Sequence, residues 1–247
     1  MGKNKLKKFA EMKGFHCVVE APCYEIVNRD HEYKGKWNEA FFHNQAPIVL
    51  ELGCGKGEYT VGMARNDDAR NFMGVDIKGA RIYTGAKIVE EEQIPNAGFL
   101  RTQVECLPAF FAPGEVGEIW ITFPDPQLKK TNKRLTSTRF LGYYRKFMTP
   151  DGIINLKTDS PFLYEYTLRL AATNGLEIID ATDDLYSRPG ECMEKEIKTF
   201  YEQQWLARGK TIKLLKFRLG DKPLVEPDVS DLEPDDYRAS ARFNRAQ

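Results

Sequence analysis

The sequence predicts an α/β protein built on a mostly parallel sheet of seven strands, with helices on both faces. Three observations lead to this prediction. Short apolar segments alternate with amphipathic segments of helical length along most of the chain. The first clear apolar segment is uninterrupted by polar residues for three positions, as expected for a strand buried on both faces. Glycines at alternate positions follow this strand, and a helical pattern follows the glycines. Such strand–helix–strand units close with right-handed crossovers.

The first strand begins at Ile48 and leads into Gly53, Gly55 and Gly57. Glycines let a ligand approach the backbone closely, and the N-terminus of the next helix offers unpaired N–H groups. The spacing G-x-G-x-G, with Glu51 at the strand tip, differs from the G-x-G-x-x-G of dinucleotide enzymes. A carboxylate there would repel a pyrophosphate and attract an ammonium group. An NAD enzyme is therefore disfavoured.

The second strand, at 71–76, ends in another acid, Asp76, which lies 25 residues after Glu51. An acid at this place can accept hydrogen bonds from both hydroxyls of a ribose. S-adenosylmethionine carries an ammonium group, a sulfonium and a ribose, so it fits both acids. The alternative is that Glu51 and Asp76 are only solvated strand ends.

The remaining elements alternate regularly. We expect one helix near 37–42, helices at 78–92, 107–111 and 136–148 and from Ser160 on, and strands at 99–102, 118–123, 153–157, 176–181 and 211–219. Ser160 should cap its helix, with Pro161 as the first helical residue. Ligands of such sheets bind at the carboxyl ends of the strands. That edge should therefore carry Glu51, Asp76, Gln103, Asp125 and Asp159.

Composition narrows the class of protein further. The 247 residues include 36 basic and 36 acidic side chains, so the net charge is zero. No apolar run reaches the roughly 18 to 20 residues that cross a membrane, and the N-terminus lacks the apolar region of a secretory signal. The five cysteines form no C-x-x-C pair, and there are three histidines. We therefore expect reduced thiols, a cytoplasmic location and no metal site.

The charges are unevenly distributed along the chain. Residues 1–13 hold five lysines and one glutamate, 126–150 hold seven basic side chains and no acid, and 221–236 hold seven acids and one lysine. We divide the chain into a basic N-terminal arm and lead-in at 1–46, a main domain at 47–220 and an acidic tail at 221–247. The arm (residues 1–15) and the tail are expected to be flexible. The basic segment can bind a phosphate backbone, and an ordinary solvated surface is the alternative.

The fourth strand runs into Phe123-Pro-Asp-Pro126, where two prolines fix the backbone around Asp125. Four basic residues follow within ten positions: Lys129, Lys130, Lys133 and Arg134. A carboxylate held beside the sulfonium, next to a phosphate-binding loop, indicates a nucleic-acid base as methyl acceptor.

These motifs resemble the tRNA (guanine-N7-)-methyltransferase family, which belongs to the Rossmann-like class I S-adenosylmethionine-dependent methyltransferases, in its bacterial single-chain type. The family carries F-P-D-P-W-P-K-K-R-H and then K-R-R-L, where this chain reads F-P-D-P-Q-L-K-K-T-N-K-R-L. Thr199-Phe-Tyr-Glu202 matches a later T-x-x-E signature. The resemblance runs from about residue 48 to 219. Three departures are Gln127-Leu128 in place of Trp-Pro, a shorter basic loop, and Gln103 where Asp or Asn is commoner.

The resemblance implies a methyltransferase domain at 47–220 that methylates N7 of guanine 46 in the variable loop of tRNA, with S-adenosylmethionine as donor and no obligatory protein partner. It implies that Asp125 is catalytic and that the cofactor contacts are Glu51, Gly53, Gly55, Gly57, Asp76, Gln103 and Asp125. It implies that the substrate contacts are Lys129, Asp159, Thr199, Phe200, Tyr201 and Glu202. From their charges, the expected RNA contacts are Lys130, Lys133 and Arg134.

Two other classes of function stay open. A class I methyltransferase for a small molecule or a protein would show no salt-dependent RNA binding. A catalytically inactive RNA-binding module would not need Glu51, Asp76 and Asp125 together.

Overall fold

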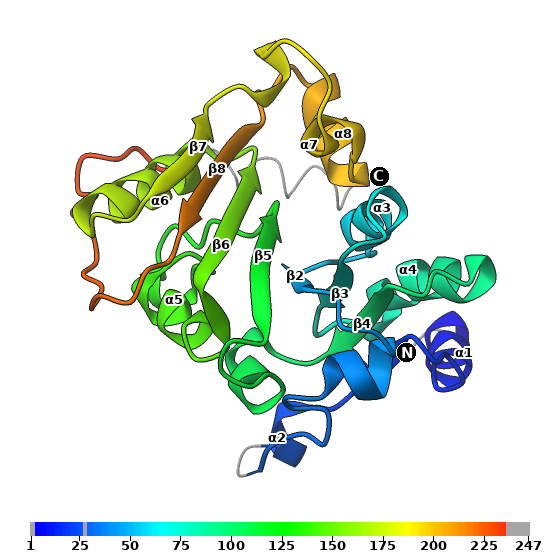
Figure 1. The fold of residues 1–247 in the computed structure, drawn as a ribbon. Coiled ribbons are helices and arrows are strands. Elements are labelled where there is room, and N and C mark those ends of the chain that lie inside the picture. The colour runs from blue at the N-terminus through cyan, green and yellow to red at the C-terminus, as the bar shows by residue number, and fades with distance from the viewer. Residues whose placement is uncertain (1–2, 27–28, 236–247) are drawn as a thin grey trace.

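The computed structural model of the protein describes residues 3–26 and 29–235. Within these residues, one sheet with strand order β1-β4-β3-β2-β5-β6-β8-β7 forms the centre of the molecule (Figure 1). The strands are β1 Val18–Glu20, β2 Ile48–Leu52, β3 Asn71–Val75, β4 Ala97–Arg101, β5 Val116–Thr122, β6 Met148–Thr158, β7 Ile178–Thr182 and β8 Lys213–Arg218.

The sheet is parallel from β1 to β6, and only β8 and β7 run antiparallel to their neighbours. The chain builds outward from β2 through β3 to β4 and then returns to β5 beside β2, which makes the β2–β5 boundary the switch point. The mostly parallel sheet is confirmed, with eight strands instead of seven. The extra strand, β1, pairs only three residues with β4 at the sheet edge, which is too short for a periodic signal.

Helices cover both faces of the sheet. They are α1 Lys3–Met12, α2 Cys23–Ile26, α3 Glu58–Asn66, α4 Gly79–Glu92, α5 Thr138–Tyr144, α6 Pro161–Thr173, α7 Met193–Glu196 and α8 Phe200–Ala207, with shorter or irregular turns η1 Trp37–Phe42, η2 Val104–Ala109, η3 Thr131–Lys133 and η4 Leu185–Ser187. Neighbouring residues of β2 enter opposite cores, because side chains alternate along a strand. Leu50 belongs to the cluster with α5 and α6, and Val49 to the cluster with α3 and α4.

The N-terminal segment packs as helix α1 along α4, which differs from the mobile basic arm that its weak apolar periodicity predicted (Figure 1). Met12 is buried, and the Phe15 ring stacks on Tyr83 with centroids 5.9 Å apart. The Tyr83 hydroxyl donates to the Glu11 carboxylate at 2.8 Å. The sparse apolar residues of this segment are therefore enough to dock one face of the helix.

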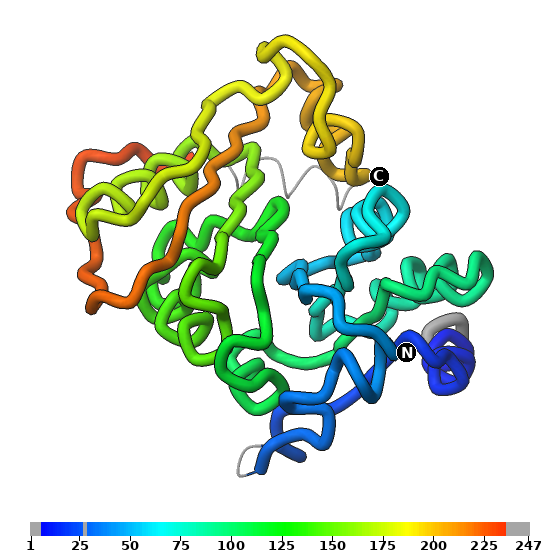
Figure 2. The backbone as a smooth tube through the Cα atoms, viewed as in Figure 1, coloured from blue at the N-terminus to red at the C-terminus, as the bar shows by residue number. Residues whose placement is uncertain are grey.

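The acidic segment 221–235 also lies against the domain, where the sequence predicted a loosely attached, flexible tail. It runs back beside α6, as the red end of the tube in Figure 2 shows. Glu226 accepts hydrogen bonds from Thr138 N at 2.9 Å and from the Tyr166 hydroxyl at 2.6 Å. Asp231 forms a two-pronged ion pair with Arg169. The acids of the tail thus meet donors of α5 and α6, while the rest of the predicted tail, 236–247, lies outside the described residues.

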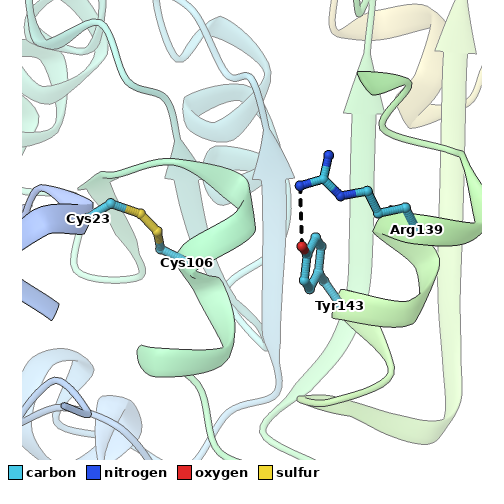
Figure 3. Close-up of a disulfide and its surroundings, with 4 residues drawn as sticks. All are labelled: Cys23, Cys106, Arg139 and Tyr143. Atoms are coloured by element: carbon cyan, nitrogen blue, oxygen red, sulfur yellow. Dashed lines mark hydrogen bonds between the residues drawn. A yellow bond between two sulfur atoms is a disulfide. The ribbon is translucent and has the colours of Figure 1, made fainter. Parts of the chain in front are cut away.

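Cys23 and Cys106 form a disulfide between α2 and η2, with Cα atoms 6.1 Å apart (Figure 3). The prediction that all thiols are reduced is therefore wrong for this pair. The two cysteines are 83 residues apart in sequence, so only the fold brings them together. Cys17, Cys54 and Cys192 are free thiols. In the described part of the chain, no helix has both the length and the apolar character to cross a bilayer, and no cluster of side chains is arranged to hold a metal ion.

Candidate active site

The sheet brings the predicted polar residues, four acids and Gln103, to one edge. Asp76, Gln103 and Asp159 follow the last residues of β3, β4 and β6 closely, and Asp125 lies three positions after β5. Glu51 lies within β2, one residue from its end. Because these strands are parallel neighbours around the switch point, their carboxyl ends meet on the same side of the sheet.

The glycine turn after β2 needs glycine for two different reasons. All three glycines have positive φ, at 73° for Gly53, 56° for Gly55 and 72° for Gly57. A Cβ on Gly57 would lie 2.5 Å from the Phe99 ring, whereas a Cβ on Gly53 would meet no atom within 4 Å. Gly57 therefore allows close packing of the helix, and Gly53 leaves open backbone on which a ligand can rest.

Asp76 lies beside this turn and is half-buried. Its carboxylate accepts hydrogen bonds from Gly55 N at 3.0 Å and from Lys78 N at 2.8 Å, one on each oxygen. Each carboxylate oxygen has two acceptor sites, so both can still accept from the hydroxyls of a ribose. The backbone contacts orient the group for that purpose.

Glu51 is enclosed between α3 and the end of β5, with 1% of its surface exposed. It accepts hydrogen bonds from Thr60 N at 2.8 Å, from the Thr60 hydroxyl at 2.5 Å and from the Thr122 hydroxyl at 2.8 Å. Burial raises the pKa of Glu51 to about 7, although these hydrogen bonds favour the ionised form. Glu51 therefore ties α3 to the sheet and can bind a proton near neutral pH.

Gln103 lines a cavity of about 680 Å³ at the carboxyl ends of β3 and β4. Ile77 and Thr102 contribute from the sheet side, and Cys23 and Tyr24 from α2. The charged side chains of Glu20, Glu25 and Arg101 complete the lining, so the cavity offers apolar contacts to the face of a flat heteroaromatic ring and polar groups to its edge. Tyr24 escaped the sequence analysis because α2, with four residues, is too short to be recognised from periodicity. Ile77 directly follows Asp76, and only the fold shows that it lines this cavity.

The turn that carries Asp125 is held in an unusual backbone conformation. Phe123 and Gln127 both have φ of 48°, a region that residues other than glycine rarely adopt. Phe123 N donates to Lys157 O at 2.8 Å, and Gln127 N donates to the Asp125 carboxylate at 2.9 Å. Such conformations persist where the surroundings enforce them, and they cluster at functional sites. The turn thus presents an exposed carboxylate in a fixed place.

The basic residues after Asp125 separate into two kinds. Lys129, Lys130 and Lys133 are exposed. Arg134 is only 2% exposed, which differs from the predicted surface contact with RNA. Its guanidinium donates to the Pro126 and Leu128 carbonyls at 3.1 and 3.0 Å and lies over the rings of Phe162 and Tyr166. Arg134 therefore fastens the loop to α6.

The T-x-x-E motif at 199–202 also separates into inner and outer residues. Thr199 and Glu202 form a capping box at the start of α8, in which each side chain accepts a hydrogen bond from the other's backbone N–H, at 3.2 and 3.3 Å. Phe200 and Tyr201 are 46% and 43% exposed. The Lys56 ammonium of the glycine turn lies 4.4 Å from the Phe200 ring. Two aromatic rings therefore face solvent beside the glycine turn.

Asp159 is buried at the end of β6, and its carboxylate lies 3.5 Å from the Lys210 ammonium. Burial raises the pKa of Asp159, partly opposed by Lys210. Lys210 and Lys157 were both missed as site-associated residues. Lys157 is fully buried in β6, but this strand also holds polar residues such as Asn155, so the sequence offered no clear signal for it.

The switch-point geometry, the open glycine turn, the acid after β3 and the cavity after β4 together define a class I S-adenosylmethionine-dependent methyltransferase. Solved structures share this fold. The 16S rRNA methyltransferase KamB has a TM-score of 0.59 at 18% identity, covering 79% of this chain and 98% of its own. The 30S ribosomal A1408 methyltransferase UncKam, from an uncultured bacterium, has a TM-score of 0.54 at 16% identity, covering 81% and 95%.

Sequence comparison identifies the family within this class. A family model described as a putative methyltransferase matches residues 45–215. A tRNA (guanine-N(7)-)-methyltransferase of Bacteroides thetaiotaomicron is 51% identical over 247 residues, covering 100% of this chain and 98% of the relative. The Porphyromonas gingivalis protein of the same name is 56% identical over 243 residues, covering 96% and 98%. The Bacillus subtilis one is 34% identical, covering 75% and 86%. The chain therefore belongs to the tRNA (guanine-N7-)-methyltransferase family.

Proposed function

We propose that this protein transfers a methyl group from S-adenosylmethionine to N7 of a guanine in tRNA, and that the target is guanine 46 of the variable loop. The names of relatives that match along nearly the whole chain support the reaction class. The observation that carries the proposal is the exposed Asp125 carboxylate, fixed between the cofactor edge and three exposed lysines.

The cofactor assignments follow from the geometry of the edge. Bound S-adenosylmethionine supplies an electrophilic methyl group. Asp76 would accept hydrogen bonds from the ribose hydroxyls, the open backbone at Gly53 and Gly55 would lie along the amino-acid part, and the cavity beside Gln103 would take the adenine. The ionised carboxylate of Glu51, at the end of β2, would attract the ammonium group of the cofactor.

Asp125 acts on the acceptor. Guanine N7 carries a lone pair and no proton, so its attack needs no general base. The methylated ring is cationic, and a fixed carboxylate stabilises the developing charge. The same carboxylate could instead accept from the guanine N1–H and N2–H groups and so aim N7 at the methyl group, in which case alignment supplies much of the rate.

The RNA-facing residues then have separate tasks. Lys129, Phe200 and Tyr201 would contact the target nucleotide, and Lys130 and Lys133 its phosphates. Asp159 is buried beside Lys210, so it would act through that lysine and not by direct contact. Arg134, Thr199 and Glu202 would hold these elements in place. A guanine stacked in folded tRNA must swing out, which costs about a few kcal/mol, and the exposed rings of Phe200 and Tyr201 offer new stacking partners. The enzyme would work in the cytoplasm, without an obligatory protein partner.

The direct test is to incubate the purified protein with labelled S-adenosylmethionine and total tRNA and to map the methylated base. A tRNA transcript with adenine in place of guanine 46 is the control. We expect N7 methylation at guanine 46 and none in the control. Label at another base would refute the position. Label in a small molecule or a protein, without any in tRNA, would refute the substrate class.

A further inference from the structure

A buried ion pair joins the end of β6 to the start of α8. The Lys157 ammonium and the Glu202 carboxylate lie 2.7 Å apart, and neither side chain has any exposed surface. Lys157 Nζ also donates to the carbonyls of Glu194 and Ile197, and the Tyr186 hydroxyl donates to Glu202 at 2.8 Å. The segment 194–202 is therefore wrapped around one ammonium group.

Lys157 and Glu202 also contact two parts of the candidate site, the Asp125 turn and the first turn of α8. The Lys157 carbonyl accepts from Phe123 N, the residue that opens the Asp125 turn with a positive φ. Glu202 closes the capping box that sets the first turn of α8, where Phe200 and Tyr201 are exposed. Phe200 N in turn donates to the Glu58 carboxylate, next to the glycine turn, at 3.1 Å. The main chain of Lys157 thus binds the Asp125 turn, its ammonium lies 5.9 Å from the Phe123 ring, and through Glu202 the same side chain is joined to the first turn of α8.

A contribution to folding stability does not by itself explain why an ion pair is buried here. Replacing a buried ion pair with uncharged residues of similar volume is often neutral or stabilising. The pair does fix the position of segment 194–197. A buried ammonium needs several hydrogen-bond acceptors at defined places, and the Glu194 and Ile197 carbonyls provide two of them.

We propose that Lys157 and Glu202 are positioning residues for methyl transfer: they hold segment 194–202 so that Phe200 and Tyr201 stand at a fixed place relative to Asp125. This proposal rests on the proposed function. The side chains of the pair contact Tyr186, the 194–197 carbonyls and the rings of Tyr59 and Phe123. Asp76 and Gln103 follow other strands, β3 and β4, so we expect the pair to act on the RNA substrate and to leave S-adenosylmethionine binding largely unchanged.

The test uses the double variant Lys157→Met/Glu202→Gln, which removes both charges and leaves none unpaired. The control is Glu118→Gln, since Glu118 is a partly buried carboxylate with several partners, Arg70, Trp120 and Asn155, and lies near the amino end of β5. Thermal unfolding, cofactor binding by calorimetry, KM and kcat for tRNA, and amide hydrogen exchange are measured for each protein.

For the double variant we expect amides of 195–203 to exchange at least about tenfold faster, which is a loss of about 1.4 kcal/mol of local protection. We also expect KM for tRNA to rise by at least about tenfold, with the cofactor Kd within about twofold of wild type. The control should show neither effect. Unchanged exchange at 195–203, or unchanged KM and kcat in a folded double variant, would overturn the positioning role.

The exchange measurement needs no tRNA and so separates the two proposals. A wild-type protein without tRNA methylation would overturn the proposed function, while the exchange rates would still decide whether the pair holds the segment. A parallel loss of cofactor binding in the double variant would also overturn the inference, because the pair would then support the whole edge.

Discussion

The exposed lysines after Asp125 give the sharpest test of RNA binding. Lys130 and Lys133 are exposed, so changing both to alanine should leave the fold intact. Each phosphate contact contributes about 0.7 to 0.9 to the slope of log affinity against log salt. Removing two contacts should therefore flatten the slope by about 1.4 to 1.8. Between 50 and 200 mM salt, wild type should lose about seven to twelve times more affinity than the variant.

Fluorescence anisotropy with labelled tRNA, repeated across a salt series, measures this difference. The matched control is Lys36→Ala/Lys222→Ala. Both control lysines are exposed. Lys36 lines a cavity together with Ile48, the first residue of β2, and Lys222 follows Asp221, which lines a cavity together with Met148, the first residue of β6. The control should keep the wild-type slope. Equal slopes for wild type and Lys130→Ala/Lys133→Ala would mean that this loop is an ordinary solvated surface and would favour a small-molecule or protein substrate.

Three further predictions concern the cofactor edge and the acceptor. Asp76→Ala should weaken S-adenosylmethionine binding by about 1.5 to 3 kcal/mol for each ribose hydrogen bond lost, and an unchanged calorimetric Kd would contradict the assignment. Asp125→Ala should abolish methyl transfer with an unchanged melting temperature, and Asp125→Asn should keep part of the activity only if hydrogen bonding outweighs charge. Because the pKa of Glu51 is raised to about 7, this group is mostly protonated at pH 6, and a cofactor ammonium beside it should expel that proton. Calorimetry at pH 6 in buffers of different ionisation enthalpy should detect the release of nearly one proton, and its absence would remove Glu51 from the ammonium site.

The order and type of the central elements could be predicted because buried parallel strands leave uninterrupted apolar runs. The strand end at Asp76 and the glycine turn were located by the same signal. Strand β1 and helices α2, α7 and α8 were missed, since each has only three to eight residues. Their positions depend on contacts with distant segments, such as the pairing of β1 with β4.

Which side of a motif faces solvent could not be predicted from the sequence. Arg134 stands in a basic run with Lys133, yet the rings of α6 and the loop carbonyls enclose only the arginine. Glu202 stands beside exposed Tyr201, yet it pairs with Lys157 from a strand 45 residues earlier. The Cys23–Cys106 disulfide depends in the same way on tertiary proximity. Charge and sequence motifs identify candidate residues. Tertiary packing then determines which of them can contact the substrate and which hold the surrounding loops and helices in place.

The central claim is that the Asp125 edge methylates N7 of guanine 46. The most direct measurement treats an unmodified tRNA transcript with the enzyme and S-adenosylmethionine and then cleaves chemically at N7-methylguanine. Wild type should give a single cleavage at position 46, and Asp125→Ala should give none at equal tRNA and cofactor binding. Cleavage at another guanine, or undiminished cleavage with Asp125→Ala, would contradict the account.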